Sequence, residues 1–147
     1  MAFWICGAVV LFLDRWTKYL VVKKLSLGHT LPVLENFFHL TYVRNSGAAF
    51  GLFADKRWFF IIITLFIFLV IIYLQYTMGK KSIWLSIILG LLFGGAAGNF
   101  IDRLKTGYVI DFIDFRGIWS YVFNIADAAI VLGMILLAWQ ILIVEKG

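Results

Sequence analysis

Aspartate is the residue type whose spacing in this sequence is most suited to chemistry. The segment YVIDFIDF contains Asp111 and Asp114, and the segment FNIAD places Asn124 one turn before Asp127. When two carboxylates share a proton, one accepts a proton from water while the other donates one to a developing tetrahedral centre. Such a pair hydrolyses a peptide bond without a metal ion or a covalent intermediate. Asp127 also suits a simpler role, because a carboxylate in the first turn of a helix complements the helix dipole.

Other hydrolytic and nucleotide-binding chemistries lack their characteristic residues. His29 and His39 are the only histidines and no H-E-x-x-H pattern occurs, which argues against a zinc peptidase. Ser46 lies next to a glycine, but the G-x-S-x-G, P-loop and G-x-G-x-x-G patterns are missing. Cys6 is the only cysteine, so it forms no internal disulfide and by itself makes no zinc site. We therefore expect no metal ion and no cofactor.

The composition is that of a membrane protein. Hydrophobic residues make up 63% of the 147 residues and charged residues 14%, whereas soluble domains are about half apolar and about a quarter charged. Four apolar segments approach the roughly 20 residues that a helix needs to cross a bilayer; they cover about 1–22, 58–78, 83–101 and 121–144. The first could be a cleavable signal peptide, but it lacks a basic start, so we favour a retained helix.

Two polar connections, about 23–57 and 102–120, separate these segments. FFHLTYVR, at 37–44, is rich in aromatic and β-branched residues and predicts a strand. Gly47 and Gly51 follow it and allow tight turns, so we expect this loop to act as a flap. The net charge of +5 is explained better by loops that meet lipid head groups than by nucleic-acid binding.

Alternation of four crossings brings the polar residues of three helices to one membrane face. The end of the first span, the end of the third and the start of the fourth all lie there, together with both long connections. Because ionisable residues in membrane helices usually face the interior of the bundle, we expect these side chains to converge. They are Asp14, Lys18, Asn99, Asp102, Arg103, Asn124 and Asp127.

Two of these groups also have purely structural interpretations. Asp14 and Lys18 are spaced i, i+4, so they form either an ion pair that holds a helix end or a support for a site. In GNFIDR, Asn99, Asp102 and Arg103 share one helix face. They form either a helix-end network alone or a network that also contacts a substrate.

Five motifs, taken in order, resemble those of the lipoprotein signal peptidases (signal peptidase II). The resemblance covers nearly the whole chain, and five ordered motifs are far more specific than any one of them. They are DRWTK at 14–18, RNSGAAFG at 44–51, GNFIDR at 98–103, VIDFIDF at 109–115 and FNIAD at 123–127.

The resemblance implies an aspartyl endopeptidase of the bacterial inner membrane. Such an enzyme removes the signal peptide from a prolipoprotein by cutting before its diacylglyceryl-modified cysteine. Asp111 and Asp127 would be catalytic, which leaves Asp114 without a catalytic role. Substrate contacts or pocket walls would come from Asn45, Asn99, Arg103 and Asn124, and support from Asp14, Lys18 and Asp102. The implied partners are the lipidated precursor, membrane lipids and the inhibitor globomycin, and no oligomer is required.

The fold implied by the resemblance is an all-α membrane protein. It has four transmembrane helices, both termini in the cytoplasm and a small extracytoplasmic β-sheet from the first loop. Residues 1–147 would then form one membrane-embedded peptidase domain. Its site would lie near the extracytoplasmic face. The charge distribution predicts the opposite orientation, because most lysines and arginines lie in the long connections and such residues favour the cytoplasm. We follow the resemblance on this point.

Two other classes of protein also use polar residues within membrane helices. A small proton-coupled carrier would place them along an ion pathway, although no inverted repeat is evident. A scaffold could bind lipidated proteins without cutting them. Both alternatives predict that neutralising Asp111 leaves peptide processing unaffected.

Overall fold

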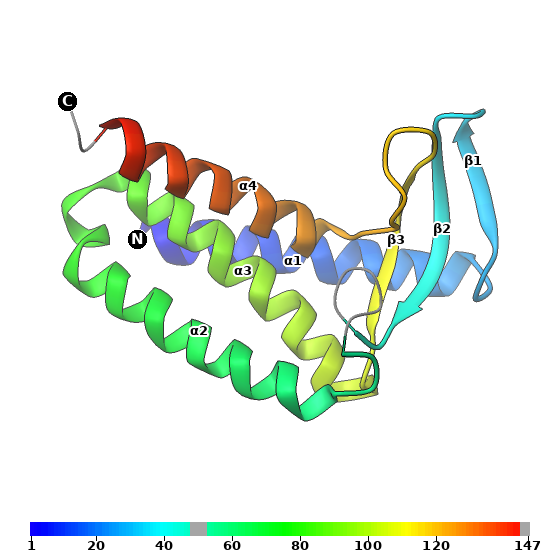
Figure 1. Ribbon diagram of the computed structural model, residues 1–147, viewed down its shortest axis with the longest axis horizontal. Coiled ribbons are helices and arrows are strands. Elements are labelled where there is room, and N and C mark those ends of the chain that lie inside the picture. The colour runs from blue at the N-terminus through cyan, green and yellow to red at the C-terminus, as the bar shows by residue number, and fades with distance from the viewer. Residues whose placement is uncertain (48–52, 145–147) are drawn as a thin grey trace.

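The computed structural model describes residues 1–47 and 53–144 and places four long helices beside one small sheet (Figure 1). The helices lie along the long axis of the molecule and the sheet lies across one end of them. α1 begins, and α4 ends, at the opposite end. In chain order the elements are α1 (Ala2–Lys24), β1 (Thr30–Leu34), β2 (Phe38–Asn45), α2 (Arg57–Thr77), α3 (Ile83–Thr106), β3 (Val109–Phe115) and α4 (Ile125–Trp139), with a 3₁₀ turn at Gly79–Lys81 and a π-helical turn at Gln140–Val144.

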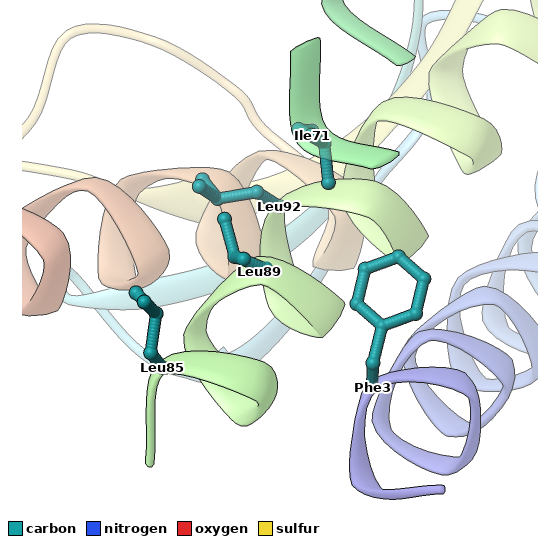
Figure 2. Close-up of a cluster of buried hydrophobic side chains, with 5 residues drawn as sticks. All are labelled: Phe3, Ile71, Leu85, Leu89 and Leu92. Atoms are coloured by element: carbon teal, nitrogen blue, oxygen red, sulfur yellow. The ribbon is translucent and has the colours of Figure 1, made fainter. Parts of the chain in front are cut away.

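α3 is the central helix of the bundle. It packs against α1, α2 and α4, and most of its apolar stretch is buried, whereas few residues of α2 and α4 are. Figure 2 shows one apolar cluster around it, in which Phe3 of α1 and Ile71 of α2 lie against Leu85, Leu89 and Leu92. The outer faces of the surrounding helices expose large apolar side chains, as expected of helices that contact lipid.

Glycines on α3 let its neighbours approach closely. A Cβ atom at Gly94 would lie 2.5 Å from the carbonyl oxygen of Gly7 on α1, and one at Gly95 would lie 2.6 Å from that of Ala126 on α4. A Cβ atom at Gly98 would meet the carboxylate of Asp14. Small residues therefore bring the polar end of α1 and the start of α4 against the same turns of α3.

Three helices are long and apolar enough to cross a membrane within residues 1–47 and 53–144. They are Arg57–Thr77, Ile83–Thr106 and Ile125–Leu142. These confirm three of the four predicted spans. α1, with 23 residues, is long enough, but it carries Asp14, Arg15 and Lys18 and so is less apolar than the other three.

The sheet is antiparallel in the order β1-β2-β3 and draws on both polar connections. β2 confirms the strand predicted at 37–44. The expectation that the sheet comes from the first loop alone is wrong, because β3 belongs to the second connection and pairs with β2. That pairing sets Val43 opposite Asp111 and Asn45 opposite Val109, which places an aspartate of VIDFIDF beside the end of β2.

Two helix boundaries also differ from the predicted ones. α3 continues to Thr106 and ends at Gly107, whose φ of +85° is the left-handed conformation that favours glycine at a helix C-terminus. Asp102 and Arg103 therefore lie inside a helix and not in the connection. α4 begins at Ile125 and not at 121, because Asn124 adopts an extended conformation and caps it.

Candidate active site

A cavity of about 780 Å³ lies where β3 meets α3 and α4. Asp111 and Asp127 both line it, from a strand and from the first turn of a helix. Its polar wall is small and is formed by Asn45, Asn99, Arg103 and the two aspartates. The remaining wall is mainly apolar and includes Ile118, Trp119, Ile130, Val131, Leu132 and Ile135. The two carboxylates thus border a space suited to an apolar ligand.

Asn124 connects the two aspartates. Its side-chain carbonyl accepts a hydrogen bond from the backbone N–H of Asp127 (2.9 Å), and its own backbone N–H donates to Oδ2 of Asp127 (3.2 Å). This reciprocal capping box fixes the start of α4. The side-chain amide of Asn124 donates to Oδ1 of Asp111 (2.7 Å) and to the carbonyl of Ile110 (3.3 Å). One residue therefore caps the helix and positions both carboxylates.

Two further asparagines each donate to one carboxylate. Asn45, at the end of β2, donates from Nδ2 to Oδ2 of Asp111 (3.2 Å). Asn99 of α3 donates from Nδ2 to Oδ1 of Asp127 (2.7 Å), while its Oδ1 accepts from Asn124 (3.1 Å). Asp127 thus both complements the start of a helix and faces the cavity.

The two carboxylates have different environments. Asp111 is only 2% exposed, whereas Asp127 is partly exposed to the cavity. Burial, and then the nearby charge of Asp127, raise the pKa of Asp111 to about 7, against the hydrogen bonds from Asn45 and Asn124 that favour its charged form. Asp111 can therefore hold a proton near neutral pH, which is a requirement for acid–base chemistry by a carboxylate pair.

A cluster of buried charges lies behind the cavity, between α1 and α3. Nζ of Lys18 is 2.9 Å from Oδ2 of Asp14 and 2.9 Å from Oδ2 of Asp102. Asp14 also accepts from the backbone N–H of Ala126 (3.1 Å), and Asp102 accepts from that of Ile110 (3.2 Å). The ion pair expected between Asp14 and Lys18 is present. Lys18 also contacts Asp102, Asp14 contacts the start of α4, and Asp102 contacts β3. The cluster therefore joins α1 and α3 to the two elements that carry Asp111 and Asp127.

Arg15 is a member of this cluster that the sequence did not single out. Its guanidinium forms an ion pair with Oδ1 of Asp102 and is partly exposed. Arg15 follows Asp14 directly in DRWTK, so the motif already showed a second cation in addition to Lys18. The motif did not show that Arg15 points toward Asp102 of another helix, because the i, i+4 rule concerns only neighbours on the same helix.

Arg103 lines the cavity and holds the chain after β2. Its Nη2 donates to the carbonyl of Gly47 (3.1 Å), and its Cζ lies 4.5 Å from the centroid of the Phe60 ring. Gly47 in turn donates its N–H to Oδ1 of Asn45 (3.0 Å). The expected flap includes Gly51, which lies outside the described residues.

Asp114 occupies a different position from Asp111, although both lie on β3. It accepts from Oγ1 of Thr41 (2.7 Å) and pairs with Arg116 (3.3 Å), whose side chain is half exposed. Asp114 is not among the described residues that line the cavity. The strand therefore presents only one of its two aspartates to the site.

The sequence profile of the family described as Signal peptidase (SPase) II matches residues 6–143, which is most of the chain. The chain belongs to the signal peptidase II family. This confirms the family predicted from the motifs and its class, the aspartic peptidases.

Relatives in this family span nearly the whole chain. A lipoprotein signal peptidase of Brevibacillus brevis is 46% identical over 91% of this chain and 90% of its own length. One from Caldanaerobacter subterraneus is 47% identical over 95% and 94%, and one from Enterococcus faecalis is 40% identical over 100% and 91%.

Solved structures agree with this assignment. A bacterial membrane enzyme determined in meso at 2.3 Å is 36% identical, with a TM-score of 0.90 over 94% of this chain and 85% of that one. A second, at 1.9 Å, is also 36% identical, with a TM-score of 0.87 over 95% and 91%. The signal peptidase II chain described here therefore shares both the fold and the membrane setting of known enzymes.

Proposed function

We propose that this chain removes the signal peptide from prolipoproteins and cuts before the diacylglyceryl-modified cysteine. The observation that carries the proposal is the pair Asp111 and Asp127 at the edge of a mainly apolar cavity, in a chain whose relatives are named lipoprotein signal peptidases. An apolar signal helix would lie along Ile130, Leu132 and Ile135, and its scissile bond would reach the aspartates.

The two aspartates would act on a water molecule held between them and the scissile carbonyl. One carboxylate takes a proton from the water, and the other gives a proton to the developing tetrahedral centre. The amide groups of Asn45, Asn99 and Asn124 hold the carboxylates in place. Substrate contacts would come from these asparagines and Arg103, whereas Asp14, Lys18 and Asp102 support the pair from behind.

The same proposal includes the placement in the membrane. α1 would be the fourth span, because Asp14 and Lys18 are fully buried against α3 and would not face lipid. The chain would then be one peptidase domain of the inner membrane, with both chain termini at the cytoplasmic side and the sheet at the extracytoplasmic side. A single copy contains all the residues of the site, so a monomer surrounded by lipid suffices, and globomycin would inhibit it by occupying the same cavity.

A cleavage assay on two precursors tests this function. We expect the purified protein to cut a diacylglyceryl-modified prolipoprotein and to leave the unmodified precursor intact, because the lipid anchors the cysteine beside an apolar cavity. Mass spectrometry of the products locates the cut relative to the lipidated cysteine. Equal cleavage of both precursors would contradict the lipid requirement. If neither precursor is cut, the chain acts on another substrate, or serves as a carrier or scaffold.

Activity should depend on pH through the proton that the aspartates share. Asp111 has a pKa of about 7, so the pair loses this proton as the pH rises above that value. We expect kcat/KM to fall above about pH 7 with a slope close to one logarithm per pH unit. Initial rates on the lipidated precursor between about pH 5 and 9 measure this limb, on both sides of that pKa. A rate that stays constant to the alkaline end of this range would contradict it.

A further inference from the structure

Lys18 is a fully buried cation behind the aspartates, and every group that it meets is an acceptor. Its Nζ lies 2.9 Å from carboxylate oxygens of Asp14 and Asp102 and donates to Oδ1 of Asn99 at 3.1 Å. An ammonium carries only donors. Asn99 must therefore turn its carbonyl oxygen toward Lys18, because the opposite orientation would set an N–H group against the ammonium.

The orientation of the Asn99 side chain decides whether Asp127 accepts a hydrogen bond from its amide nitrogen. With Oδ1 held by Lys18 and also by Nδ2 of Asn124 (3.1 Å), the amide nitrogen of Asn99 points at Oδ1 of Asp127 (2.7 Å). The other oxygen of Asp127 accepts the backbone N–H of Asn124 (3.2 Å). Asp127 thus has a donor on each oxygen, and these donors fix the orientation of its carboxylate in the first turn of α4.

We propose that Lys18 is a positioning residue for the reaction: it locks the amide of Asn99, which holds the carboxylate of Asp127 in place to accept the proton from water, while Asp111 gives the proton to the tetrahedral centre. This inference rests on the proposed peptidase function and adds the assignment of the base and the acid. Lys18 makes this contribution through Asn99.

The surroundings of the pair fit this division of roles. Asp111 lies on a strand and is more deeply buried than Asp127. Among the described residues, Arg103 of α3 and Asp111 of β3 are charged groups that interact with Asp127. The charged cluster behind Asn99 consists of Asp14, Arg15 and Lys18 of α1 and Asp102 of α3. In the cluster behind the site, the charges of Asp14 and Asp102 balance those of Arg15 and Lys18. Removing Lys18 alone leaves a net negative charge next to Asn99.

The test is the pH profile of Lys18→Met, a substitution that nearly keeps the length of the side chain. We expect kcat to fall about tenfold with KM little changed. The acid limb of the profile should move up by about one pH unit, because a nearby cation and an N–H donor both favour a carboxylate. Arg15→Met is the matched control, since Arg15 lies on the same helix, pairs with the same Asp102 and does not contact Asn99. Arg15→Met removes a cation of the same cluster but leaves the bond from Lys18 to Asn99, so its acid limb should move less than that of Lys18→Met.

Two further variants separate positioning from folding. If Lys18→Met does not fold, the pH profile is measured on the double variant Lys18→Met with Asp14→Asn. That variant keeps the cluster neutral, because Arg15 and Asp102 remain as one cation and one anion. In an Asn99→Ala background, Lys18→Met should cause little additional change, because the two residues act in series. A wild-type pH profile in the Lys18 variants, an equal shift in Arg15→Met, or additive effects of Lys18 and Asn99 would overturn the inference. A wild type that cuts no lipidated precursor would instead overturn the proposed function.

Discussion

Asp111→Asn and Asp127→Asn are each expected to lower kcat for cleavage of the lipidated precursor by about 10³-fold or more. Each substitution removes one of the two groups that accept and donate the proton, and general acid–base steps are worth roughly 10²–10⁴-fold. An asparagine preserves the shape of the side chain and part of its hydrogen bonding to Asn124. The loss should therefore be in kcat, with KM close to that of the wild type, in single-turnover and steady-state assays.

Asp114→Asn is the matched control for this prediction. It changes the same residue type on the same strand, but Asp114 contacts Thr41 and Arg116 and does not line the cavity. Its activity should stay within about twofold of the wild type, since surface ion pairs contribute little. If Asp114→Asn were as inactive as Asp111→Asn, or if all three variants cut normally, the assignment of Asp111 and Asp127 would be wrong.

A stability measurement distinguishes lost chemistry from lost folding. The pKa of Asp111 is about 7 in the folded chain, above its ordinary value of 3.8. The free energy of unfolding therefore decreases as the pH rises from the ordinary value to about 7, and above that it changes no further through this group. The amide that replaces this carboxyl in Asp111→Asn does not ionise. The variant should therefore melt at the same temperature as the wild type or higher at about pH 8. This gain should shrink as the pH falls and disappear below the ordinary value of 3.8, where Asp111 is protonated in both the folded and the unfolded chain.

The convergence of the polar residues of the helices could be predicted because their spacing along helices is local information. Asn99, Asp102 and Arg103 share a face by the helical repeat, and alternation of the spans sets the end of α3 beside the start of α4. The structure brings Asn99 and Asp127 within 2.7 Å. The cap at Asn124 was not predicted, and the predicted start of the fourth span, at 121, lies before the observed helix start at Ile125, because the apolar run does not mark where capping begins.

The parts that could not be predicted are pairings between distant segments. β3 pairs with β2, a strand far from it in the sequence, and no local pattern specifies that partner. The side-chain bond from Asn45 to Asp111 that this pairing allows joins residues 66 positions apart. The sequence placed VIDFIDF in the second connection and predicted no strand there, but the segment forms β3, on which Asp111 faces the cavity and Asp114 meets Thr41. Likewise, the ion pair of Arg15 with Asp102 joins two helices whose relative rotation depends on the glycines of α3.

Asp102→Ala is expected to cause the largest loss of stability among the site residues. Asp102 is almost fully buried and accepts from Arg15, from Lys18 and from the backbone N–H of Ile110. Alanine would leave a buried ammonium with one carboxylate fewer and a buried N–H without its partner. Breaking a buried ion pair in this way costs about 3–5 kcal/mol, and in a chain of this size Tm should fall by roughly 10 °C.

Thermal melting in detergent measures this loss, with Asp114→Asn as the control for removing an aspartate that is less buried. The control should stay within about 0.5 kcal/mol of the wild type. Activity should also fall in Asp102→Ala below its melting temperature, because the bond to Ile110 anchors β3 directly before Asp111. An Asp102→Ala protein with wild-type Tm would show that the buried cluster does not hold α1, α3 and β3 together. In that case the asparagines alone would have to position the two aspartates.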